Sequence, residues 1–162
     1  MKKLYTVLTL VFLSVAALAQ NGRELYRKYS DSPGMEAVYI SPAMFRMIGR
    51  IPDVEFQEGS VNFSSIIKSM TGFYILNTSD PATGKALYND VNRFVDAGSF
   101  ELLMEAKDNG SVMRMYTAGD NSTVHSFVML SQDEGEVSFI SFDGKMEREE
   151  LENILADAAK DK

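Results

Sequence analysis

Apolar residues recur at helical spacing in four stretches of the chain. The first, 41–52, places Ser41 as N-cap and Pro42 at the first helical position. The others are 62–70, 80–98 and 147–160, and a shorter helix is expected over 23–29. The four apolar faces consist of Met44, Met47, Ile48 and Ile51; Phe63, Ile66, Ile67 and Met70; Leu87, Val91, Phe94 and Val95; and Leu151, Ile154, Leu155 and Ala158.

Short apolar runs bounded by turn residues predict strands between these helices. Two stand early in the chain, and the last four follow one another: 36–41, 72–77, 100–107, 111–117, 123–131 and 136–142. Asn109-Gly110 is a strong hairpin signal because both residues tolerate a positive φ. Asp120-Asn121 and Glu134-Gly135 stand where the next two turns are needed. The sequence therefore predicts an α+β fold, with a largely antiparallel sheet that ends in a four-strand meander and packs with about four helices.

The turn at Asn109-Gly110 also predicts a strand register. A two-residue turn there pairs Asp108 with Ser111 and sets Glu105 opposite Arg114, an opposite-charge pair. One face of this hairpin is expected to be core, and it carries Leu102, Met104, Ala106, Met113 and Met115.

The other face of the meander is the candidate binding surface. A two-residue turn at Asp120-Asn121 would place His125 opposite Tyr116 and Phe127 opposite Arg114. That face would then gather Leu103, Val112, Tyr116, Phe127 and Met129. This is more apolar than a solvated sheet face usually is, so either a helix covers it or a partner docks there. The candidate binding residues are Leu103, Tyr116, Phe127 and Met129.

Residues 1–19 have the features of a secretory signal peptide. Lys2 and Lys3 form a charged start, 5–16 is mostly apolar, and Ala17 and Ala19 fit a cleavage site. The sequence predicts cleavage before Gln20 and a single α+β domain over 20–162. A retained anchor is the alternative, but the stretch is shorter and differently flanked than a typical membrane span. An exported protein, periplasmic or extracellular and without a transmembrane anchor after processing, is expected.

Charge and cysteine content narrow the function classes. The full chain carries a net charge of −7, and loss of Lys2 and Lys3 with the signal peptide makes it −9. Such an acidic chain repels nucleic acid and anionic membrane surfaces, so no nucleic-acid partner is expected. The absence of cysteine excludes disulfides, a thiol nucleophile and a zinc–thiolate site.

The remaining polar motifs give little support to catalysis. His125 is the only histidine, and no G-x-S-x-G elbow accompanies it. Histidine metal sites usually need more than one such ligand, so no zinc, copper or haem site and no cofactor is expected. Thr78, Ser79 and Asp80 precede Pro81 and are interpreted as a helix cap. The acidic residues at 133–136 and 147–152 are interpreted as solvated, although a carboxylate pair distant in sequence stays open.

The ten methionines have two interpretations. Methionine fills irregular cores and also lines adaptable binding surfaces. Core packing is favoured, and a methionine-lined cavity for an apolar ligand is the alternative.

Several long stretches resemble a known family. They are "LYRKYSDSPGMEAVYISPAMFRMI", "IIKSMTGFYIL", "SFELLMEAKDNGSVMRMYTAGD" and "FVMLSQDEGEVSFISFDGKMEREELENIL". Together they resemble the exported Bacteroidetes proteins grouped as domain of unknown function 4252, over nearly all of the mature chain. A "YEEL"-like stretch of that family is here Phe100-Glu101-Leu102-Leu103, with Phe in place of Tyr. The resemblance implies an envelope protein and supplies no catalytic residues.

These observations favour an exported, non-enzymatic envelope module that binds a protein or another envelope component. A periplasmic carrier of an apolar ligand is the alternative. A hydrolase built on a pair of carboxylates is the third hypothesis.

Overall fold

The computed structural model describes residues 21–48 and 69–158, which form a six-stranded sheet and four helices. The strands are β1 (Met35–Ile40), β2 (Met70–Thr78), β3 (Phe100–Asp108), β4 (Ser111–Gly119), β5 (Thr123–Asp133) and β6 (Glu136–Glu147). The helices are α2 (Gly22–Tyr29), α3 (Pro42–Ile48), α5 (Pro81–Ala97) and α6 (Arg148–Ala158). All neighbouring strands pair antiparallel, in the order β1-β2-β6-β5-β4-β3. The predicted α+β class and the C-terminal four-strand meander are confirmed.

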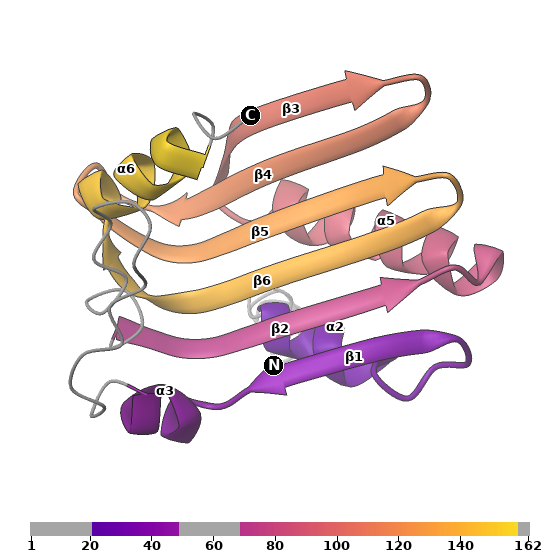
Figure 1. Cartoon of the computed structure of the whole chain (residues 1–162), viewed down its shortest axis with the longest axis horizontal. Helices are drawn as coiled ribbons and strands as arrows, with labels where there is room; N and C mark the ends of the chain where they lie inside the picture. Colours follow the sequence, from indigo (N-terminus) through magenta and orange to yellow (C-terminus); the bar gives the residue numbers. More distant parts are fainter. Residues whose placement is uncertain (1–20, 49–68, 159–162) are drawn as a thin grey trace, which may run out of the picture.

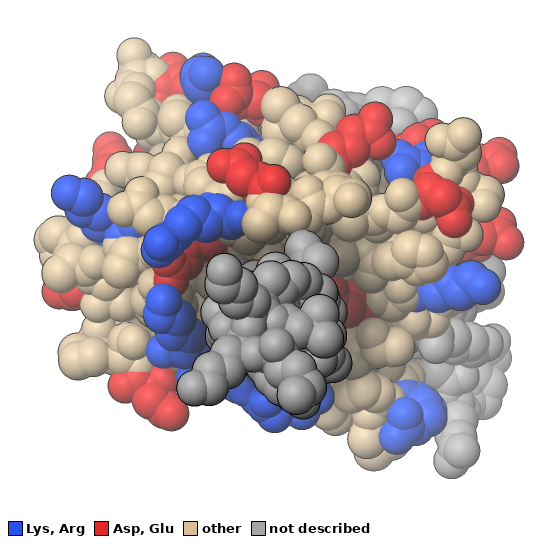
Figure 2. Space-filling model, turned by 180° about the vertical axis from the view of Figure 1, so that it is seen from behind, with Lys and Arg blue, Asp and Glu red and all other residues tan. Residues whose placement is uncertain are grey.

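The two faces of the sheet are covered unequally. Helices α2 and α5 lie behind the sheet in Figure 1, and we call the side that they cover the α5 face. Helix α6 lies on the opposite side, near one end of the strands, and we call that side the α6 face. Seen from behind, basic and acidic side chains are scattered over the helical side of the molecule (Figure 2).

The main hydrophobic core lies on the α5 face. Leu76 and Phe139 from the central strands β2 and β6 are fully buried there against Leu87 and Val91 of α5. A smaller cluster on the α6 face joins Val124, Phe127, Met146 and Leu151. Alternate residues of β2 are fully buried toward α5 and half-buried toward α6. Burial on the α6 face is therefore incomplete.

The predicted cap of α5 is confirmed. The Asp80 carboxylate accepts a hydrogen bond of 2.8 Å from the Thr83 amide, and Pro81 occupies the first turn. The Thr78 hydroxyl donates to the Gly34 carbonyl at 2.8 Å and accepts from the Asp80 amide at 3.1 Å. The hydroxyls and the acid at this strand-to-helix junction thus bond to backbone groups of the fold itself.

Two details of the predicted helices are wrong. Met70 begins β2 instead of ending a helix, although Ser69 just before it is helical; residues 62–68 of the expected helix lie outside the described residues. In α3, Phe45 is buried, whereas Met44 and Met47 of the predicted apolar face are 47% and 65% exposed. The side chain of Ile48 and the whole of Ile51 lie outside the described part of the chain. This helix has only seven residues, too few for the spacing of apolar residues to fix which side faces the sheet. Among the described residues, no helix is long and apolar enough to cross a membrane.

Candidate functional site

An apolar row of six residues crosses the α6 face. Each strand contributes one residue, and each residue is the direct register partner of the next. From one edge of the sheet to the other, the apolar row consists of Val38, Ile75, Ile140, Met129, Met115 and Met104. At a strand spacing of about 4.8 Å, the row spans roughly 24 Å.

Every member of the apolar row retains contact with solvent in the described structure. The two ends are the most open, with Val38 46% and Met104 42% exposed. The four members between them are half-buried. On the α5 face, by contrast, the corresponding central residues Leu76 and Phe139 have no exposed area. The apolar row therefore presents a continuous apolar surface, which monomeric soluble proteins rarely leave without a function.

The surroundings of the apolar row differ on its two sides. Toward α6 it adjoins Phe127 and Phe142, whose rings stack with centroids 4.7 Å apart. Toward the hairpin turns lies a more polar row that includes Asn77, Ser138 and Ser131. Each neighbouring row also holds one charged residue at an edge strand of the sheet: Glu36 of β1 is the register partner of Asn77, and Glu101 of β3 is the register partner of Thr117. The apolar row thus has an aromatic border and a polar border.

The structure divides the four predicted binding residues between the two faces. Leu103, Phe127 and Met129 belong to the α6 face, where Leu103 and Met129 pack against the cluster around Phe127. Tyr116 lies on the α5 face and packs against the main core. The prediction that all four share one surface is wrong.

Two departures from regular pairing separate these residues. The Asn109-Gly110 hairpin has the predicted register, and Glu105 pairs with Arg114 at 2.7 Å. A bulge near Leu103 then places Leu102, not Leu103, opposite Tyr116.

The second departure lies between β4 and β5. The connection spans 120–122, and the pairing shifts again next to His125. Phe127 therefore pairs with Thr117 instead of Arg114. The register changes by an odd number of residues, so the Phe127 side chain points to the opposite face of the sheet.

The hairpin residues predicted to be core are also placed differently. Leu102 lies on the α5 face with 51% of its area exposed. Met104, Ala106, Met113 and Met115 share the α6 face, where they are exposed or half-buried. The sequence correctly predicted that these four residues share one face of the hairpin. The larger hydrophobic core, however, lies on the opposite face of the sheet.

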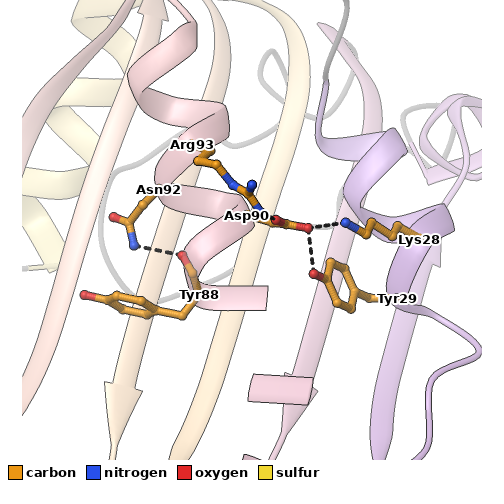
Figure 3. Close-up of polar contacts among 6 residues, drawn as sticks. All are labelled: Lys28, Tyr29, Tyr88, Asp90, Asn92 and Arg93. Atoms are coloured by element: carbon orange, nitrogen blue, oxygen red, sulfur yellow. Dashed lines mark hydrogen bonds and ion pairs between the residues drawn. The ribbon is translucent and has the colours of Figure 1, made fainter. Parts of the chain in front are cut away.

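A buried carboxylate, Asp90, joins α5 to α2 (Figure 3). It accepts hydrogen bonds from the Tyr29 hydroxyl at 2.7 Å, from Lys28 and from Arg93. Burial by itself would raise the pKa of Asp90, but these three hydrogen bonds outweigh it and hold the pKa below the ordinary value. Because three donors already occupy its oxygens, we assign Asp90 a structural role. Sequence reasoning missed this cluster, since Lys28 and Tyr29 lie about sixty residues before Asp90 in the chain.

The pKa of a second carboxylate, Asp143, is shifted in the opposite direction. Burial raises its pKa above the ordinary value of 3.8, and the hydrogen bond from Ser126, 2.8 Å long, compensates only in part. The folded chain therefore holds a proton here more strongly than the unfolded chain. Stability from this group is complete below pH 3.8 and is lost as the pH rises through the higher folded pKa.

We therefore expect Asp143→Asn to raise the free energy of unfolding at neutral pH. Asparagine keeps an oxygen that accepts from Ser126 and removes the cost of the buried charge. Urea unfolding at a series of pH values should show the gain shrinking as the pH falls toward 3.8. The same exchange at exposed Asp31 is the control and should change little. A gain that does not vary with pH would contradict the electrostatic explanation.

The other candidate chemical groups are dispersed. His125 is exposed on β5. Asp120 accepts from the backbone of Ser122 and Thr123 and so fixes the β4–β5 turn. A hollow between the β3–β4 and β5–β6 turns is lined by Asp108, Asn109, Gly110, Ser111, Gln132, Asp133, Glu134 and Gly135. This polar lining gives no support to an apolar-ligand carrier.

Comparison with known proteins yields one match. The model of a family described as Domain of unknown function (DUF4252) matches residues 29–154. No curated protein and no solved structure shows a significant match to the chain.

Proposed function

The chain belongs to the DUF4252 family, a domain of unknown function, and we propose that it is an exported, non-enzymatic module that binds a protein of the cell envelope through its α6 face. The observation that carries this proposal is the apolar row, whose six members stay partly exposed across the whole sheet. Three of the residues that the sequence indicated for binding, Leu103, Phe127 and Met129, lie in or beside it.

The location rests on the leader sequence. Lys2 and Lys3, the apolar stretch after them and the small residues Ala17 and Ala19 together favour export and cleavage before Gln20. The mature protein would then act in the periplasm or outside the cell.

The net charge favours a partner of a different kind over a second copy. Two chains that each carry −7, or −9 after processing, repel one another on approach. A partner with an apolar patch and a neutral or basic rim avoids this repulsion. Such a partner also suits the methionines of the row, since flexible thioether side chains adapt to varied apolar surfaces.

The test compares two exposed residues of β3 that lie on opposite faces. Met104 belongs to the apolar row, whereas Leu102 is on the α5 face. We expect Met104→Asp to weaken capture of envelope proteins from the source organism by at least about tenfold, because a charge there must be desolvated on docking. Quantitative mass spectrometry of the captured proteins measures the effect. The intact mass of the exported bait should correspond to a chain that begins at Gln20.

Leu102→Asp is the matched control and should leave capture unchanged. Equal capture by the wild type and by both variants would contradict docking at the apolar row. Equal loss in both variants would point to damage of the edge strand instead of a specific surface, and circular dichroism of each variant checks this.

A further inference from the structure

Half of the apolar row consists of methionine. Met104 on β3 is the register partner of Met115 on β4, and Met115 is the register partner of Met129 on β5. These three strands lie side by side at one edge of the sheet in Figure 1. Three thioether side chains therefore leave the same sheet face at directly adjacent positions.

The spacing allows the three sulfur atoms to converge. Paired residues on neighbouring strands have their Cβ atoms about 5 Å apart. Met104 and Met129 need to lean inward by only about 2.5 Å each to share one small ion above Met115. Methionine is unbranched and has three rotatable bonds, so such a movement requires no change in the backbone.

The neighbourhood favours a soft ion over a hard one. Residues of the same face on either side of Met115 and Met129 are uncharged: Met113, Thr117, Phe127 and Ser131. Hard cations such as calcium, magnesium and manganese prefer oxygen ligands, which the three methionines do not supply. Thioethers are soft ligands, and they match the soft ion Cu(I).

The three methionines also combine access with partial shielding. Met104 is 42% exposed at the sheet edge, so an ion can enter from solvent. Met115 and Met129 are half-buried and pack against the cluster around Phe127 on the α6 face. An ion bound there would have apolar surroundings on the inner side, which strengthen its attraction to polarisable ligands.

From this arrangement we propose that Met104, Met115 and Met129 form a binding site for Cu(I). The sequence-based expectation of no copper site considered histidine ligands and did not consider thioethers. This inference goes beyond the proposed binding of an envelope protein and does not depend on it, because the site lies within a single chain.

The test uses the purified mature chain with ¹³C-labelled methionine methyl groups. Ag(I), which is redox-inert and has the same ligand preference, is added while the methyl signals are followed by NMR. We expect the signals of Met104, Met115 and Met129 to shift together, and those of Met44 and Met47 to stay in place. Zn(II) should leave all of them unchanged.

Anaerobic competition with a chromophoric Cu(I) chelator then measures the affinity. Met115→Leu keeps the apolar volume and removes the central thioether, so it should weaken Cu(I) binding by at least about tenfold. Met47→Leu is the control and should change nothing, because Met47 lies on α3, outside the apolar row, and is 65% exposed. Shifts spread evenly over all methionines, no binding, or equal affinity in Met115→Leu would each overturn the proposal.

Discussion

Replacing Asp90 by alanine is expected to lower the free energy of unfolding by about 2–3 kcal/mol. The substitution leaves the buried Tyr29 hydroxyl without its acceptor and removes the polar contacts of Asp90 that join α5 to α2. The Lys28 and Arg93 side chains are largely exposed, so most of the loss comes from the hydroxyl and from the cavity and little from the two cations.

Urea unfolding of the wild type and of Asp90→Ala at neutral pH measures this loss. Asp96→Ala, at an exposed position of the same helix, is the control for helix propensity and should change stability little. The pKa of Asp90 lies below 3.8, so the difference should persist down to that pH and shrink only at lower pH, as the carboxylate is protonated. Should Asp90→Ala and Asp96→Ala lower the free energy of unfolding equally, the hydrogen bonds of Asp90 have no special role in stability.

The second large effect is expected at Phe139, which lies between α5 and the centre of the sheet. Phe139→Ala should cost about 3–5 kcal/mol, because the side chain is fully buried and the surrounding residues cannot fill the cavity. Ile140, the next residue of β6, points to the other face and is half-buried in the apolar row. Ile140→Ala should therefore cost about 1–2 kcal/mol.

The ratio of these two losses is informative about function. Both variants shorten neighbouring side chains of one strand, so they share the same local backbone and differ mainly in the face that is affected. Thermal and urea unfolding of the isolated protein measure both. Should Ile140→Ala cost as much as Phe139→Ala, the α6 face is a second sealed core in solution, and docking at the apolar row becomes untenable.

Local signals in the sequence were sufficient for much of the fold. Asn109 and Gly110 have φ angles of 45° and 95°, which few other residue pairs adopt readily, so the β3–β4 turn and its register could be predicted. Asp80 and Pro81 similarly marked the start of α5. In each case the residues that carry the information are adjacent in the chain.

The candidate site depended on features that have no such local signal. Inserting one residue in the β4–β5 turn or as a bulge near Leu103 changes the face of every residue beyond it, and the amino acids at these points permit either arrangement. The pairing of β2 with β6 joins segments about sixty residues apart, so the apolar row could not be assembled from the sequence. The sequence correctly predicted that Met104 and Met115 share a face, but it placed Met129 on the opposite face.

The position of β6 in the sheet limits the order in which the strands can assemble. β6 is the last of the six described strands, yet it lies between β2 and β5 and, within the described sheet, alone joins the β1–β2 pair to the other strands. A chain that is synthesised or threaded from its N-terminus therefore holds two separate sheet fragments until residue 147 has emerged. The complete sheet can therefore form only after the C-terminal part of the chain is available.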